Sequence, residues 1–118
     1  MKYLCLVHLE DGVFAALSEE RKDEIGRRSF AYDEELKSAG HLIHADALQS
    51  PASAVLVKLR NGKMSAAGGP FTKAREQLVG FILIEARDLD EATGLAAGIP
   101  LAELGTIEVR PIYEFAPR

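Results

Sequence analysis

The chain has 118 residues, of which 47% are hydrophobic and 27% charged, as in an ordinary soluble globular domain. Its 14 basic and 18 acidic side chains give a net charge of −4, which argues against nucleic-acid binding, because that function needs a basic surface. The apolar runs are too short to span a membrane, and a single cysteine excludes an internal disulfide. We expect one domain over residues 1–118 in the reducing cytoplasm, with no nucleic-acid or membrane partner.

The first elements are predicted to be a strand, a helix and a second strand. Lys2 to Leu9 (KYLCLVHL) is an apolar run that stops at an acidic pair and a glycine, which favours a strand. A helix is predicted from its cap at Ser18 to Ala39, because helix formers fill this stretch and a glycine follows. His41 to Leu48 (HLIHADAL) then favours a strand. One apolar stripe of the helix is expected to face the core: Leu17, Ile25, Phe30, Tyr32 and Leu36.

A hairpin and a central strand are predicted next. Ser53 to Arg60 (SAVLVKLR) and Lys63 to Ala67 flank Asn61-Gly62, a dipeptide that suits the positive φ angles of a type I′ turn. Val79 to Ala86 (VGFILIEA) is the most hydrophobic run of the chain. We therefore expect it at the centre of a sheet.

The chain closes with a helix and a strand. Asp88-Leu89-Asp90-Glu91 has the capping-box pattern and predicts the start of a helix over Leu89 to Ala97. Thr106 to Tyr113 (TIEVRPIY) favours a strand, and Pro111 within it argues for a place at an edge or a bulge.

The order of these elements predicts the fold. Without the hairpin it is strand, helix, strand, strand, helix, strand, which is the βαββαβ plan of a ferredoxin-like α+β fold. Helices gather on one face of such a sheet, so the other face needs a cover. A second copy commonly supplies that cover in a small domain, and we expect a homodimer of the dimeric α+β barrel type.

The second half of the chain resembles a known family. The segments "GGPFTKAREQLVGFILIEARDLDEA" and "GTIEVRPI" are similar to the DGPF-domain branch of the YCII-related family. The amino-terminal "MKYLCL", the helix end "LKSAG" and "ALQSP" resemble the same family, so the similarity spans nearly the whole chain. It implies a dimeric ferredoxin-like fold with a cleft beside the sheet. It also implies small-molecule enzymology and, for some members, a link to alternative sigma factors.

Two positions differ from the pattern of that family. Gly68 stands where the DGPF motif has its aspartate, and Ser29 stands roughly where some members carry a histidine in the first helix. A His–Asp pair has been proposed as the active centre of those members. The proposed catalytic roles of that histidine and that aspartate are therefore not carried over to Ser29 and Gly68 of this chain.

Strand alternation predicts a polar site on the open face. It places Leu42, His44 and Asp46 on one face of their strand, with Glu108 and Arg110 on the same side of the last strand. A carboxylate two residues from an imidazole can orient it as a general acid or base. Arg110 would hold the carboxylate or enolate of a small substrate with two hydrogen bonds. The alternative is a polar dimer interface in which these groups satisfy one another.

The loop that follows the hairpin is a second candidate ligand site. Gly68 and Gly69 can adopt backbone angles closed to other residues, Pro70 fixes the next φ, and Phe71 would anchor the loop in the core. Successive N–H groups of such a turn can bind an anion. The alternative is a turn that only reverses the chain.

Two functions remain open from the sequence. One is a non-catalytic dimer that binds a small anionic or aromatic ligand, or a regulatory partner. The other is an enzyme, a lyase, isomerase or hydrolase, that moves a proton with His44 and Asp46. No metal site and no cofactor are expected, because three histidines and one cysteine show no ligand spacing and no nucleotide motif is present. His8 is predicted to be a hydrogen-bonded structural residue.

Overall fold

The fold is ferredoxin-like with an extra hairpin, as the sequence predicts. The computed structural model describes residues 1–115. Six strands and two helices follow one another along the chain: β1 (Lys2–Glu10), α1 (Glu19–Ser38), β2 (Leu42–Ala47), β3 (Val55–Arg60), β4 (Lys63–Gly68), β5 (Glu76–Glu85), α2 (Leu89–Ala97) and β6 (Thr106–Pro111). Two short 3-10 turns, η1 (Pro51–Ser53) and η2 (Pro100–Glu103), complete the list.

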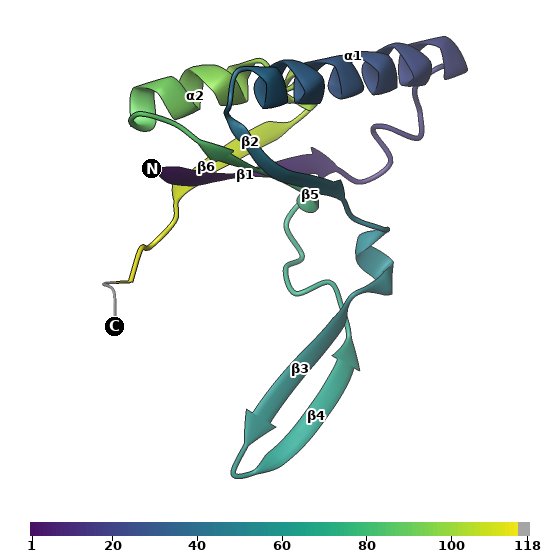
Figure 1. The fold of residues 1–118 in the computed structure, drawn as a ribbon. Helices are drawn as coiled ribbons and strands as arrows, with labels where there is room; N and C mark the ends of the chain where they lie inside the picture. The colour runs from purple at the N-terminus through teal and green to yellow at the C-terminus, as the bar shows by residue number, and fades with distance from the viewer. Residues whose placement is uncertain (116–118) are drawn as a thin grey trace.

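Four strands form one antiparallel sheet in the order β2-β5-β1-β6. The two most apolar strands, β1 and β5, lie at its centre, and β6 with Pro111 lies at an edge, as predicted. Both helices cover the same face of this sheet, which leaves the other face without a layer (Figure 1). We call these the helix-covered face and the open face.

The core lies between the sheet and the helices. Tyr3 and Cys5 of β1 and Ile84 of β5 are fully buried, and they pack with Leu36 of α1 and Ala92 of α2. Burial raises the pKa of the Cys5 thiol to about 11. One expectation about the helix was wrong, because Phe30 is 69% exposed. The stripe of α1 that reaches the core is narrower than predicted.

Side-chain caps fix where both helices begin. The hydroxyl of Ser18 accepts a hydrogen bond from the N–H of Arg21 at 3.1 Å and starts α1. The carboxylate of Asp88 accepts from the N–H of Glu91 at 2.9 Å and starts α2. The Glu91 carboxylate in turn accepts from the N–H of Arg87 at 2.8 Å. These caps satisfy N–H groups that have no partner inside a helix.

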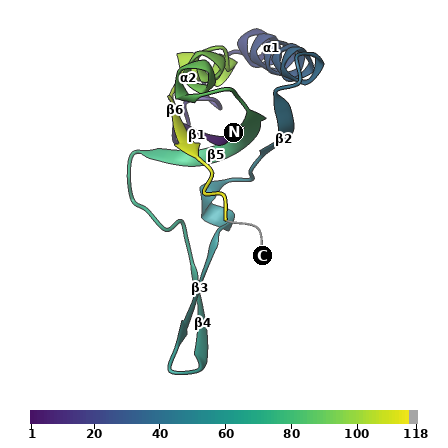
Figure 2. The same cartoon turned by 60° about the vertical axis from the view of Figure 1, so that its left-hand side comes forward.

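The hairpin β3–β4 is a separate two-stranded sheet. Asn61 and Gly62 have φ angles of 51° and 74°, so the predicted two-residue turn is present. Figures 1 and 2 show that the hairpin extends away from the four-stranded sheet, on the side opposite the helices. We call residues 55–68 the arm. It neither extends the sheet nor covers it.

Candidate functional site

A β-bulge in β2 decides which of its residues reach each face. Leu42 lies opposite Ile84 and His44 lies opposite Leu83, so the register shifts by one residue between Leu42 and His44. Leu42 consequently packs against the core, although simple alternation placed it with His44. That expectation was wrong because the bulge inserts one extra residue and reverses the side-chain direction.

The predicted polar residues of the open face lie at its two edges. Strand pairing sets one row across the face from His44 through Leu83 and Leu4 to Arg110. A parallel row runs from Asp46 to Glu108 and crosses two further apolar residues, Phe81 and Leu6. Residues opposite one another in neighbouring strands share a face, so all eight side chains point to the open side.

His44 and Arg110 are not brought together. Three strand spacings separate them, which is about 14 Å. The centre of the face between them is apolar. A substrate held between the His44 imidazole and the Arg110 guanidinium of one chain would therefore have to bridge the whole sheet.

Each edge of the open face carries a histidine–carboxylate pair. Nε2 of His44 lies 2.6 Å from Oδ2 of Asp46, and the ring of His44 lies 5.9 Å from that of Phe81. Nε2 of His8 lies 3.0 Å from Oε1 of Glu108. An ionised carboxylate only accepts, so each imidazole donates through Nε2. The hydrogen bond of His8 confirms the prediction made for it.

The glycine–proline loop differs from its predicted form. Neither Gly68 nor Gly69 has a positive φ. A Cβ on Gly69 would lie 2.8 Å from the Cβ of Ala54, and its N–H donates to the Ala54 carbonyl at 2.8 Å. Gly69 is therefore needed for close packing, and its N–H is not available to an anion. Phe71 is 85% exposed, so the expectation that it anchors the loop in the core was wrong.

A cavity of about 260 Å³ lies under α1, on the helix-covered side of the sheet. Its walls come from α1, β1, β2, β5, η2 and the residue before η2, and most of the lining residues are apolar. Three polar side chains of α1 reach it: Ser29, Tyr32 and Asp33. The hydroxyl of Tyr32 already donates to the carbonyl of Leu95 at 2.6 Å. Ser29 and Asp33 are therefore the polar residues of α1 that could form hydrogen bonds to a ligand.

Asp33 is electrostatically distinct in this cavity. Burial raises the pKa of its carboxyl, and the negative charge of the neighbouring Glu34 raises it further. A carboxyl that keeps its proton to higher pH can donate a hydrogen bond, and after ionisation it can accept a proton. Perturbed carboxyls in cavities are typical of functional sites.

Sequence reasoning missed Asp33. Its signal was present, because Ser29 and Asp33 are four residues apart and lie on one face of a helix. In the sequence, Ser29 stands out only as a departure from the family pattern. The cavity beneath the helix could not be predicted from the sequence. Its space depends on small residues in the opposing strands: Ala45, Ala47 and Gly80.

Across residues 1–115, no group of three or more histidine, cysteine, aspartate or glutamate side chains is arranged to hold a metal ion. Within the same range, neither helix has the length and apolar character needed to cross a membrane.

Comparison with known proteins agrees with the fold. A solved structure of 5-chloro-2-hydroxyhydroquinone dehydrochlorinase (TftG) from Burkholderia phenoliruptrix AC1100, in complex with 2,5-dihydroxybenzoquinone, superposes with a TM-score of 0.57. The match covers 98% of this chain and 96% of that chain at 16% sequence identity, and it shows a shared fold.

Sequence comparison assigns the family. An uncharacterised protein of Rhizobium meliloti (strain 1021) is 31% identical over 119 residues, which are 99% of this chain and 96% of that protein. The model of the YCII-related domain matches residues 1–116. The chain belongs to the YCII-related family.

Proposed function

We propose that the protein binds a small hydroxylated ring compound in the cavity under α1. The observation that carries this proposal is Asp33, which lines a mostly apolar cavity and whose carboxyl has a raised pKa. A cavity of about 150 Å³ takes up benzene, so 260 Å³ leaves room for one ring and its substituents. The hydroxyl of Ser29, one turn earlier on α1, offers a second hydrogen bond to the ring.

The lining favours a neutral compound over an anion. The described residues that line this cavity include no lysine, arginine or histidine. Asp46 also lines it, but the Asp46 carboxylate is hydrogen-bonded to His44 on the open face, so Asp33 is the acid that concerns a ligand. An anion would meet the Asp33 carboxyl with no cationic side chain in the lining to offset its charge, at an electrostatic cost. A phenol or enol can instead donate its hydroxyl proton to the Asp33 carboxylate. The ligand named for the structural neighbour is also a small hydroxylated ring, and it supports the binding of a ring by analogy of fold alone.

Ligand-induced thermal stabilisation tests this proposal. A ligand at about 100 times its dissociation constant stabilises by about 2.7 kcal/mol and moves the midpoint by several degrees. Phenol, catechol, hydroquinone and benzoate are the probes, and the neutral compounds should shift the native chain more than benzoate. Asp33→Asn should lose most of the shift and Ser29→Ala part of it.

Asp23→Asn is the matched control, because it makes the same change at an exposed position of the same helix. Its shift should equal that of the native chain. Equal shifts in Asp33→Asn and the native chain would contradict the assignment of the ligand to this cavity.

A second candidate function is supported by the His44–Asp46 hydrogen bond on the open face. In an enzyme that transfers protons, a lyase, isomerase or hydrolase, His44 would be the acid or base and Asp46 would hold its tautomer. His44→Ala should then abolish turnover while the free energy of unfolding stays within about 0.5 kcal/mol of the native value. Unchanged turnover in His44→Ala would remove this candidate.

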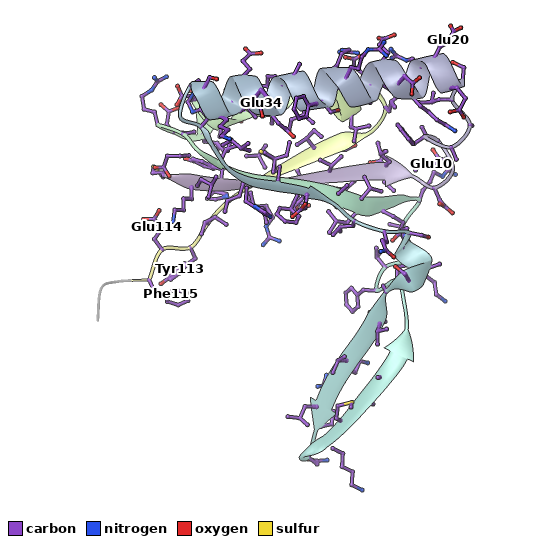
Figure 3. All side chains as sticks on the ribbon, turned by 45° about the vertical axis from the view of Figure 1, so that its right-hand side comes forward. Glu10, Glu20, Glu34, Tyr113, Glu114 and Phe115 are labelled. Atoms are coloured by element: carbon purple, nitrogen blue, oxygen red, sulfur yellow. The ribbon has the colours of Figure 1, made fainter. Side chains whose placement is uncertain are left out.

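We also infer a homodimer that covers the open face. The apolar centre of that face, Leu4, Leu6, Phe81 and Leu83, has no covering layer in the described chain. Figure 3 shows Tyr113 and Phe115 beyond β6, on the side of the sheet away from α1. Their rings lie 4.9 Å apart in an edge contact. Sedimentation velocity over a range of protein concentrations tests this association. If a regulatory partner covers the open face instead, the isolated chain should stay monomeric.

A further inference from the structure

The arm has one apolar face and one basic face. Val57 lies opposite Ala66 and Leu59 lies opposite Met64, so these side chains share a face. Val57 is 66% exposed and Leu59 65% exposed, and Val55 and Met64 on the same face are similarly open. Two-stranded hairpins are at best marginally stable in water by themselves. An apolar face of this size therefore indicates an occupant.

The basic face carries an uncompensated charge. Lys58, Arg60 and Lys63 give the arm a charge of +3, because residues 55–68 contain no aspartate or glutamate. Arg60 and Lys63 lie directly opposite one another in the hairpin, a like-charge pairing that destabilises a ribbon. None of the three is paired with a carboxylate in the described part of the chain. A negatively charged partner would relieve this repulsion.

The rest of the chain has the complementary charge. The whole chain has a net charge of −4, so the chain without the arm has −4 − 3 = −7. The four strands of the main sheet contain five acids and two bases, which give −3. A two-stranded ribbon is one layer thick. Its charges therefore stay within about one Debye length of a surface that it covers, where attraction still acts.

The arm does not reach its own sheet. It points away from the body in both views (Figures 1 and 2). The radius of gyration is 16.4 Å, against about 13.5 Å for a compact chain of this length. Strands of six residues are about 20 Å long, which matches the width of a four-stranded sheet. Another molecule of the same chain presents an apolar, acid-rimmed surface of that size.

We propose that the arm docks on a second copy of the chain, with its apolar face against the open face of that copy. This inference rests on the proposed homodimer and goes beyond it, because it names the arm as the segment that covers the partner. In a symmetric dimer each arm would lie on the other subunit. The contact would bury Val57 and Leu59 and place Lys58 and Lys63 near the acids of the partner sheet.

Sedimentation velocity with two arm variants tests the docking. Val57→Glu/Leu59→Glu should raise the dimer dissociation constant at least tenfold, because it puts two carboxylates on the contact. Lys58→Glu/Lys63→Glu should weaken association several-fold, and added salt should reduce that difference. Phe30→Glu is the matched control, since Phe30 is equally exposed but lies on α1, and it should leave the dissociation constant unchanged.

Each other outcome has a definite meaning. Dimers of unchanged affinity in both arm variants would overturn arm docking and leave the proposed homodimer intact. A native chain that stays monomeric at all concentrations would overturn both. Duplex DNA is the competing occupant for a basic ribbon, and fluorescence anisotropy measures it. Loss of DNA binding in Lys58→Glu/Lys63→Glu, with unchanged self-association, would assign the arm to nucleic acid and overturn the proposal.

Discussion

The two faces of the four-stranded sheet are built from alternate residues of the same strands, yet they hold their polar groups in different ways. On the open face, His44 with Asp46 and His8 with Glu108 form two exposed pairs at the edges. On the helix-covered face, Asp33 of α1 lines a mostly apolar cavity, and burial raises the pKa of its carboxyl. A polar group that is hydrogen-bonded to water and to a partner side chain costs the folded state little free energy. A partly buried carboxyl with a raised pKa costs stability when it ionises, which is why it suggests a function.

The sharpest test of this comparison uses neighbouring residues of β5. Ile84 is 1% exposed on the helix-covered face, and Ile84→Ala should cost about 2–5 kcal/mol through lost burial and a cavity. Leu83→Ala, one residue away on the open face, should cost less than about 1.5 kcal/mol in dilute protein. Urea unfolding at two protein concentrations measures both.

If the homodimer covers the open face, the cost of Leu83→Ala should grow with protein concentration while that of Ile84→Ala should not. Equal costs for the two variants in dilute protein would show that the faces do not differ as described.

The next largest effect is expected where the loop after β4 meets η1. Gly69→Ala would place a methyl group 2.8 Å from the Cβ of Ala54 and should cost about 1–3 kcal/mol. Gly68→Ala is the control, because a Cβ at that position meets no atom within 4 Å. Differential scanning calorimetry of the two variants compares them. A Gly68→Ala variant that is the less stable of the pair would contradict the close approach at Gly69.

The helix layer also depends on its caps. Asp88→Ala removes the acceptor for the N–H of Glu91 at the start of α2 and should cost about 1 kcal/mol. Asp90→Ala, in the first turn but without a capping hydrogen bond, should cost less. Urea midpoints of both variants give the difference, and equal losses would mean that only the charge near the helix end matters.

The smallest expected effect is a change in pH dependence. Because the folded-state pKa of Asp33 is raised above its ordinary value of 3.8, stability from the protonated carboxyl is present below that value and is lost as pH rises through the folded pKa. Asp33→Asn cannot ionise. Its free energy of unfolding relative to the native chain should therefore increase between pH 4 and pH 7.

Urea unfolding of the native chain, Asp33→Asn and Asp23→Asn at both pH values measures this change. A difference between native and Asp33→Asn that is the same at pH 4 and pH 7 would remove the electrostatic basis of the candidate site.

Much of the fold could be predicted because its signals are local. The caps at Ser18 and Asp88, the turn at Asn61-Gly62 and the apolar runs of β1 and β5 depend on neighbouring residues, and all are present as expected. The exceptions depend on contacts between distant segments. The bulge after Leu42 follows from pairing with β5, and Phe71 is exposed because the arm leads its loop away from the core.

The candidate site was harder to predict than the fold. The pair His44 and Asp46 could be found, because alternation acts within one strand. The distance between His44 and Arg110 could not, since it depends on the order of four strands. Asp33 was missed because a cavity is defined by small residues on another element, and no local pattern marks them.

Cys5 has a practical consequence for experiments on this chain. It is the only cysteine, it lies at the centre of the core, and its pKa of about 11 leaves roughly one molecule in ten thousand as thiolate at neutral pH. Maleimide dyes, spin labels and cross-linkers react with thiolates, so we expect them to leave the native protein unlabelled. Cysteines introduced one at a time on the arm or the sheet could then be labelled to test the proposed dimer, without any need to replace a core residue.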